Sequence, residues 1–351
     1  MSQSMRDAQH IADDVLFPAA IEVERSGRVP KTHLDLLAEK GFYSLAAPEE
    51  LTTLDLPDYP AVQRVVELLA GGCLTTAFVW VQHHGAMSAA AKTSNETIRA
   101  EYLAPLAAGA RRAGMAIGAA ARPGPPMLRA TAVPGGWRFT GTAPWVTGWD
   151  MVDTLYVAAR QEDDVLVWAL VDATESASMT VRPLEMIAVQ ASRTVTLEFH
   201  DHFVPDDRVT ALQPRSEYLE GDAESLRFTG SLARGVADRA IRLMGEDGAA
   251  LSAELASVRE RLQQAAPQDV PVGRAVSSEF ALRAAAALFV HQGSSSVLID
   301  SHPQRLLREA AFLLNFGTRP TIRQSLLDQL TTPRDHGVGT TPRFDEPHTH
   351  P

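Results

Sequence analysis

The sequence predicts an α+β protein of several domains, with a helical N-terminal domain, a central antiparallel β-barrel or β-sandwich domain and a C-terminal four-helix bundle. Apolar residues recur at helical spacing up to about residue 110, short β-prone runs follow, and helical spacing returns from about residue 220. We place the domains at residues 1–110, 111–214 and 215–330. Residues 331–351 are polar and rich in Pro, Thr, Asp and His, so we expect a disordered tail.

The N-terminal third has helical periodicity with clear stop signals. Pro18 falls inside the first periodic run and is expected to kink or divide it. Gly41 ends the second run. The fourth run is apolar almost all round, which is typical of a buried helix. The predicted helices cover residues 4–25, 32–40, 60–70 and 75–92.

The remaining elements are short strands followed by helices. Regularly spaced β-prone runs with turns between them are typical of a compact antiparallel domain. The predicted strands cover residues 115–121, 128–133, 137–140, 154–159, 165–171, 179–181 and 194–199. After a break marked by Pro267 and Pro271, the helical pattern resumes; the C-terminal helices are predicted at 220–245, 249–264, 277–290, 304–314 and 322–330.

Composition limits the class of protein. The chain has 351 residues and 45% hydrophobic residues, enough for two or three domains with packed cores. A net charge of −11 argues against nucleic acid as the main partner, because phosphates require clustered Lys and Arg. The single cysteine, Cys73, excludes an intramolecular disulfide and a Cys-rich zinc site. The polar start and the lack of a run of about 18 apolar residues lead us to expect a cytoplasmic protein without a membrane span.

Residues 136–160 carry the strongest functional signal. They predict two strands joined by an exposed corner that carries Trp145, Val146 and Thr147. A flat aromatic face and a short hydroxyl can hold a planar heterocycle, because one packs against the ring and the other hydrogen-bonds its edge. The residues alone leave open a plain alternative, in which two ordinary strands are joined by a bulky loop and the tryptophans belong to the core.

The corner resembles the Asn-Gly-x-Lys-x-Trp-Ile-Thr-Asn region of acyl-CoA dehydrogenases. This chain has Thr140-Gly141-Thr142-Ala143-Pro144-Trp145-Val146-Thr147-Gly148. Residues 102–109 resemble the family's Tyr-Leu-Pro-x-Leu-Ala-x-Gly, and residues 191–205 resemble the strand that closes its β domain. The resemblance extends over residues 16–330 and rests on the order and spacing of several motifs.

The resemblance implies a function and its partners. It implies bound FAD and α,β-dehydrogenation of an acyl-CoA thioester in lipid metabolism, with hydride transfer to FAD. It also implies an electron-transfer flavoprotein or similar acceptor, and assembly into a homo- or hetero-oligomer, as a dimer or tetramer. By the same resemblance, the cofactor-binding residues are Trp145, Val146, Thr147, Ser294, Gly317 and Thr318.

Some of the expected flavin contacts depart from the family pattern. The family has Thr-Glu-Pro…Gly-Ser-Asp where this chain has Ala121-Arg122-Pro123-Gly124, so a threonine hydroxyl that meets the flavin is missing. The Gly-Gly-x-Gly turn that neighbouring subunits contribute corresponds to 293–296, which keeps one glycine. Serine hydroxyls such as that of Ser294 could donate to phosphate there instead.

The catalytic base is the largest departure. The reaction needs a carboxylate over the α-carbon. In most of the family a glutamate in Tyr-Glu-Gly-Thr supplies it; here Gly317 and Thr318 remain, but Phe316 stands in the glutamate's place and cannot accept a proton. A minority of the family carries the glutamate on the first C-terminal helix. Glu224 lies about one residue from that slot and is our candidate base.

Two other functions stay open at this point. The chain could be a non-catalytic or half-catalytic subunit that pairs with a complete homologue, as the loss at Phe316 and the degraded phosphate turn favour. It could also be a flavin-dependent monooxygenase on the same fold, which needs no α-carbon base.

The histidine pairs predict no metal site. His83 and His84 point about 100° apart on a helix, so they do not share a metal edge and are expected to pack or to line a pocket. His200 and His202 would share a sheet face, but no third ligand is evident in the sequence.

Overall fold

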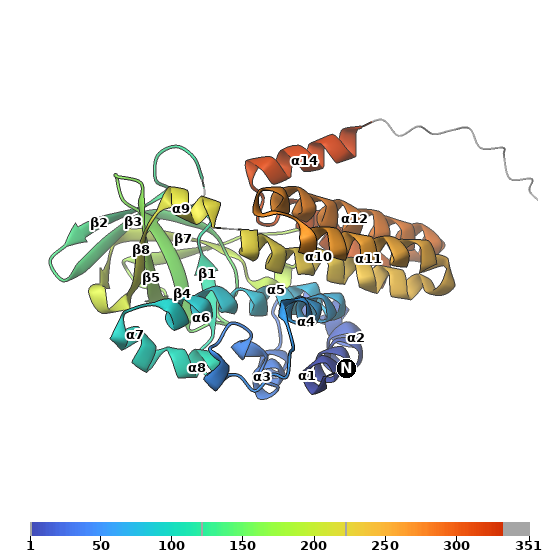
Figure 1. Ribbon diagram of the computed structural model, residues 1–351, viewed down its shortest axis with the longest axis horizontal. Helices are drawn as coiled ribbons and strands as arrows, with labels where there is room; N and C mark the ends of the chain where they lie inside the picture. Colours follow the sequence, from blue (N-terminus) through green and yellow to red (C-terminus); the bar gives the residue numbers. More distant parts are fainter. Residues whose placement is uncertain (1, 121, 222, 333–351) are drawn as a thin grey trace, which may run out of the picture.

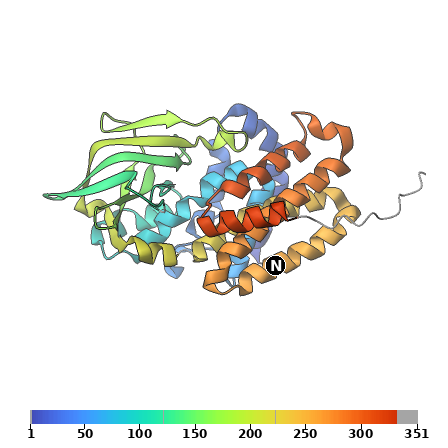
Figure 2. The same ribbon diagram turned by 90° about the horizontal axis from the view of Figure 1, so that it is seen from above.

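The computed structural model describes residues 2–120, 122–221 and 223–332. The sheet lies at one end of the molecule, the C-terminal helices lie at the other, and the N-terminal helices run beneath both (Figure 1). The view from above shows the same two ends side by side (Figure 2). The predicted tail at 331–351 lies outside the described residues apart from Thr331 and Thr332.

The N-terminal region is helical. One helical stretch runs from Gln3 to Ser26 and changes register in the middle, where residues 11–16 form a π-helical segment. Pro18 lies in the first turn of the helix after that segment, so the predicted division is a change of register rather than a break. The helices are α1 (Gln3–His10), α2 (Phe17–Ser26), α3 (Lys31–Glu39), α4 (Tyr59–Gly72), α5 (Leu74–Val81), α6 (His83–Lys92), α7 (Glu96–Glu101) and α8 (Leu103–Ala107).

Within the described residues, eight strands form one sheet in the order β6-β7-β3-β2-β4-β5-β8, with β1 paired to β4. Most pairs are antiparallel; β1 and β2 each run parallel to β4. The strands are β1 (Ala113–Ala116), β2 (Leu128–Val133), β3 (Gly136–Val146), β4 (Thr154–Arg160), β5 (Val165–Asp172), β6 (Met179–Pro183), β7 (Val195–Pro205) and β8 (Val209–Pro214).

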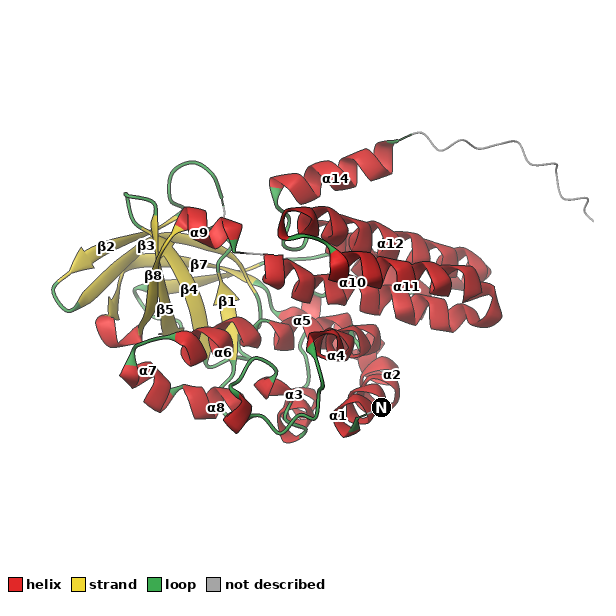
Figure 3. Ribbon diagram, viewed as in Figure 1, coloured by secondary structure: helices red, strands yellow, loops and turns green. Residues whose placement is uncertain are grey.

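The C-terminal region is again helical, and its long helices pack side by side (Figure 3). Pro271 was expected to lie in a break, but it occupies the first turn of α12, where its missing N–H leaves no helical hydrogen bond unmade. The helices are α9 (Arg215–Glu220), α10 (Ala223–Met244), α11 (Ala249–Gln264), α12 (Val270–His291), α13 (His302–Asn315) and α14 (Pro320–Thr331).

A shared core joins the N-terminal and C-terminal helices. All eight residues of α5 are buried, as expected for a helix that is apolar all round. Helices α4 and α10 cross closely at Gly71 and Gly235; a Cβ on Gly71 would stand 2.8 Å from the carbonyl oxygen of Gly235. The two glycines therefore set the distance between the N-terminal region and the bundle.

The predicted fold class is confirmed, with local differences. The sheet does not close into a barrel, because its two edge strands, β6 and β8, are not paired with each other. The predicted helix 75–92 is divided at Gln82. Strand β8 was not predicted, since its sequence Val-Thr-Ala-Leu-Gln-Pro alternates only weakly.

Candidate functional site

The predicted corner is the end of strand β3. A bulge between Ala143 and Val146 interrupts the pairing of β3 with β7, and Trp145 inside it has a φ of +63°. A bulge turns a side chain away from the regular alternation of a strand. The Trp145 side chain is 56% exposed, whereas Val146 and Thr147 are buried. The expectation of a wholly exposed corner is therefore wrong for those two residues.

Three hydroxyls form a buried chain beside Trp145. The Thr147 and Thr194 hydroxyl oxygens are 3.1 Å apart, and those of Ser192 and Thr194 are 2.8 Å apart. Three hydroxyls carry three protons, and the two contacts use two of them. One O–H therefore remains that can donate to the edge of a ligand.

A second loop, residues 189–194, packs against the corner. The backbone N–H of Gly148 donates to the Ser192 carbonyl at 2.9 Å, and the N–H of Trp149 donates to the Arg193 carbonyl at 3.3 Å. Val189 and Arg193 have φ values of +50° and +51°. Such backbone costs roughly 1–3 kcal/mol per residue in proteins and gathers at functional sites. The corner at Trp145 and the loop 189–194 therefore both contain strained backbone, and hydrogen bonds join them.

The helical side of the site is aromatic. The Phe78 ring of α5 lies edge-on to Phe316 at 4.9 Å and to Phe312 at 5.2 Å, and the latter two rings stack at 5.9 Å. The family pattern has a carboxylate at this place. Here the Phe316 ring occupies it and packs against other aromatic rings.

Gly317 and Thr318 continue from Phe316 into the turn before α14. Gly317 is exposed with a φ of +65°, and the Thr318 hydroxyl donates to the Asn315 carbonyl at 2.7 Å. The Arg319 guanidinium donates to the Tyr218 hydroxyl of α9 at 3.2 Å, so this turn lies at the end of the bundle that faces the sheet.

Glu224 lies in the first turn of α10, at the same end of the bundle. Its side chain is 71% exposed and forms an ion pair of 3.2 Å with Arg227. The Tyr59 hydroxyl donates to the Glu224 carbonyl oxygen at 3.2 Å, which fixes the backbone of the helix start while the carboxylate stays at the surface.

Ser294 lies far from the other predicted cofactor residues. It is exposed in a short 3-10 helix after α12, at the end of the bundle away from the sheet (Figure 1). The nearby ion pair between His291 and Asp247 marks the same end. The structure therefore brings together Trp145, Val146 and Thr147, places Gly317, Thr318 and Glu224 at the facing end of the bundle, and separates Ser294 from all of them.

The adjacent histidines of α6 have different surroundings. His83 accepts from the N–H of Ala113 at 3.1 Å and lies 3.1 Å from the Leu106 carbonyl, so it is a satisfied core residue. Burial lowers the pKa of His83 to about 3. His84 packs against Trp80 and Phe228. Over residues 2–120, 122–221 and 223–332, no group of three His, Cys, Asp or Glu side chains could hold a metal ion.

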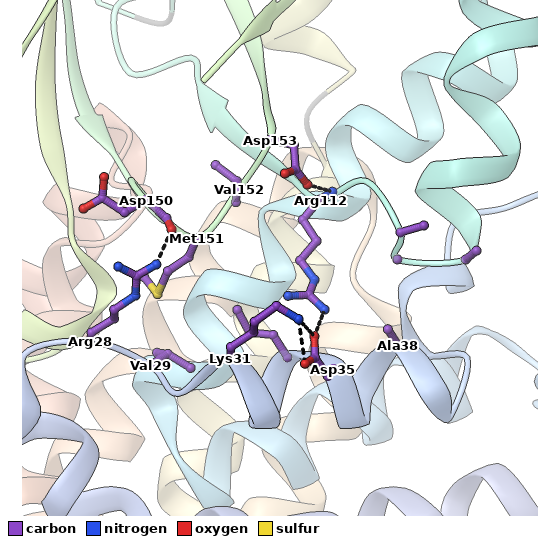
Figure 4. Close-up of a pocket in the computed structure, with 14 residues that line it drawn as sticks. Arg28, Val29, Lys31, Asp35, Ala38, Arg112, Asp150, Met151, Val152 and Asp153 are labelled. Atoms are coloured by element: carbon purple, nitrogen blue, oxygen red, sulfur yellow. Dashed lines mark hydrogen bonds and ion pairs between the residues drawn. The ribbon is translucent and has the colours of Figure 1, made fainter. Parts of the chain in front are cut away.

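A cavity of about 490 Å³ adjoins the corner through Asp150 and Met151. Figure 4 shows that Lys31 and Arg112 both reach Asp35 in the cavity wall, at 2.8 and 2.6 Å. Arg28 donates to the Asp150 carbonyl. The buried Nε of Arg112 has no hydrogen-bond partner, and the cavity lacks the flat aromatic face of the corner.

Sequence reasoning missed Ser192 and Thr194 as site residues. Both lie in the segment whose resemblance to the closing strand had been noted, but nothing in the local pattern pairs them with Thr147. The contact depends on the antiparallel pairing of β3 with β7, which brings residues about 47 apart into register.

Comparison with known proteins accounts for this architecture. Residues 2–110 match the family model of the acyl-CoA dehydrogenase N-terminal domain. The fold matches a glutaryl-CoA dehydrogenase of Mycobacterium smegmatis, solved in complex with FADH2, with a TM-score of 0.81 over 94% of this chain and 95% of that chain at 17% identity. Residues 2–110 belong to this N-terminal domain family, and the chain as a whole has the acyl-CoA dehydrogenase fold.

Two further comparisons match this chain. The short-chain specific acyl-CoA dehydrogenase of Bos taurus mitochondria is 25% identical over 215 residues, which cover 59% of this chain and 51% of the bovine protein. The match therefore spans about half the length of that relative. A structure solved as the electron transferring flavoprotein of Acidaminococcus fermentans matches with a TM-score of 0.78 at 16% identity, over 95% of this chain and 99% of that chain.

Acyl-CoA dehydrogenases as a family are FAD-dependent oxidoreductases of lipid metabolism. Among the helices of the described residues, none combines the length and the apolar character that crossing a membrane requires.

Proposed function

We propose that this protein, which has the acyl-CoA dehydrogenase fold, binds FAD at the Trp145 corner and catalyses α,β-dehydrogenation of an acyl-CoA thioester. The observation that supports this best is the pairing of an exposed, conformationally strained tryptophan with a hydroxyl chain that has one O–H to spare. An aromatic face and a free donor at its edge are what a flavin ring needs from its protein.

The residues of the corner fit this role. Trp145 would lie against the ring, and the Thr147–Thr194–Ser192 chain would donate to its edge. Gly317 and Thr318 face the sheet end and would contact the cofactor from the bundle side. Ser294 lies in the 3-10 helix after α12, at the opposite end of its own bundle, so it would contribute from a neighbouring copy. The proposal thus requires a dimer or tetramer, of this chain or with a homologue.

FAD, when bound, would accept the hydride that leaves the β-carbon of the acyl group. The chain itself must take the α-proton. We propose Glu224 for this role, because its carboxylate is exposed at the sheet-facing end of α10. Electrons would then pass to an electron-transfer flavoprotein or a similar acceptor.

One observation favours a second candidate function, that of a half-catalytic subunit in a mixed assembly. Phe316 is packed between Phe78 and Phe312, so the usual base position is closed by an aromatic cluster rather than merely emptied. A subunit that keeps flavin contacts but leaves proton transfer to a complete homologue would show this combination.

Purification separates the two candidates. The protein expressed alone should be yellow, carry close to one FAD per chain, and lose its flavin absorbance when an acyl-CoA is added without oxygen. A colourless protein that becomes yellow only with a co-expressed homologue would establish the half-catalytic subunit. A colourless protein under both conditions would contradict both proposals.

A further inference from the structure

In the described part of the chain, the buried arginines are paired with carboxylates, with one exception. Six arginines are buried among the described residues: Arg160, Arg227, Arg234, Arg239, Arg274 and Arg305. Five of them form ion pairs, with Asp164, Glu224, Glu67, Asp13 and Glu309 respectively. Arg274 of α12 has no carboxylate partner within the described part of the chain.

The contacts of Arg274 are neutral. Its Nη1 donates to the Ser278 hydroxyl, and its Nη2 donates to the Phe316 carbonyl oxygen at 3.4 Å. Burial, together with the nearby charge of Arg234, lowers the pKa of Arg274 to about 10. The Arg274 guanidinium therefore stays protonated at neutral pH. The charged side chain that lowers its pKa, Arg234, is also a cation.

Arg234 of α10 has an unused donor beside Arg274. Its Nε is 2.6 Å from Glu67, and its Nη2 donates to Ser231 at 2.9 Å, but its buried Nη1 has no partner. Gly230 lies between the two guanidinium-bearing side chains: a Cβ there would be 3.2 Å from Arg274 Cδ and 3.5 Å from Arg234 Nη1.

An unpaired ion in a protein interior is unfavourable by several kcal/mol, so buried charges are normally matched by a counter-ion. We propose that a single small anion, of the size and charge of chloride or formate, binds between Arg234 and Arg274 beside Gly230. The anion accepts hydrogen bonds from the free Nη1 of Arg234 and from the Arg274 guanidinium. Its negative charge balances the charge of Arg274, which has no carboxylate partner.

The surroundings limit the size of the ion. A methyl group at Gly230 would already stand 3.1 Å from Leu262 and 3.2 Å from Arg274. This close packing favours a small ion and leaves no room for the phosphate group of a cofactor. The ion would link α10, α12 and, through the Phe316 carbonyl, the turn that leads into α14. This inference does not depend on the proposed function.

Thermal unfolding of the purified protein tests the site. Chloride is exchanged for gluconate at constant ionic strength, so that general screening is unchanged. The unfolding temperature should rise by about 2 °C for each tenfold increase in chloride above the dissociation constant. Arg274→Met removes the charge at similar volume and should abolish the rise.

Arg283→Met is the matched control, because Arg283 lies on the same helix but is paired with Glu254. This variant should keep the response to chloride. Gly230→Ala is a second variant that leaves both arginines in place and introduces a methyl group 3.2 Å from Arg274 Cδ and 3.5 Å from Arg234 Nη1. It should also lose the response, which keeps the test decisive should Arg274→Met fail to fold.

Bromide locates the ion directly. Crystals of the wild-type protein soaked in sodium bromide should show an anomalous peak between the two guanidinium groups. A chloride response that persists in Arg274→Met or in Gly230→Ala, or bromide peaks confined to the protein surface, would overturn the proposal.

Discussion

The sheet side and the helical side of the candidate site differ in the chemical groups they present. The sheet side has an exposed Trp145 and three hydroxyls with a proton to spare, held by two loops in strained conformations. The helical side has Phe316 stacked on Phe312 and set edge-on to Phe78, and the exposed carboxylate of Glu224 is proposed to act nearby.

This difference separates binding from chemistry. Strained backbone persists only where the surrounding structure maintains it, and on the sheet side it supports groups suited to a planar ring. Aromatic packing needs no function to explain it, since it stabilises the bundle on its own. We therefore predict that substitutions on the sheet side change FAD binding, whereas substitutions on the helical side change stability or the reaction rate.

The largest expected effect concerns the proposed base. Glu224→Gln keeps the shape of the side chain but cannot take a proton, so the rate of flavin reduction by acyl-CoA should fall by about 10²–10⁴-fold. FAD content should stay the same. Glu220→Gln, which changes an exposed carboxylate of α9 nearby, is the control and should leave the rate unchanged. An unaltered rate in Glu224→Gln would remove this residue as the base and favour the half-catalytic subunit.

Phe316→Ala tests the helical side as a packing element. Loss of its contacts with Phe78 and Phe312 should lower the free energy of unfolding by about 2–4 kcal/mol, measured by denaturant titration. The affinity for FAD should change less than about threefold, because the ring contacts lie on the sheet side. Loss of the cofactor from a folded Phe316→Ala protein would show that the two sides are not separable.

Trp145→Ala is the converse test. Removing the aromatic face should weaken FAD binding by about tenfold, measured by titration of the apoprotein, with little loss of stability because the ring is mostly exposed. Phe203→Ala removes another exposed aromatic ring of the same sheet and should leave FAD binding intact. Equal effects of the two substitutions would mean that exposure of Trp145 carries no special role.

The smallest effect concerns the scaffold beneath both sides. Partial burial favours a higher pKa for Asp13, but hydrogen bonds from Arg242 and Arg239 outweigh it and lower the pKa to about 2 from the usual 3.8. The stabilisation is therefore present above about pH 4 and is lost as the pH falls towards 2. Asp13→Asn should lower stability by about 1 kcal/mol at neutral pH and flatten this acid transition in thermal melts. If Asp13→Asn loses as much stability at low pH as the wild-type protein does, other carboxylates cause the acid sensitivity.

The sequence predicted the order of regions because periodicity and turn residues are local signals. It also located Trp145 and Thr147, since their motif is contiguous. It could not give the bulge that exposes Trp145 while burying Thr147, because that depends on pairing with β7. Ser192 and Thr194 were likewise missed, since their partner lies on another strand.

The unpaired Arg274 also left no trace in the sequence. A single arginine on a helix is usually a surface residue, and the lack of a counter-ion appears only when α10, α12 and the turn after α13 are assembled.

A crystal structure of the purified protein with FAD is the most direct test of the division between the two sides. We predict the flavin ring against Trp145, with its edge within hydrogen-bonding distance of Thr147 and with Phe316 still packed on Phe78. A flavin bound elsewhere, or Trp145 covered by a neighbouring copy with no space for a ring beside it, would contradict the account.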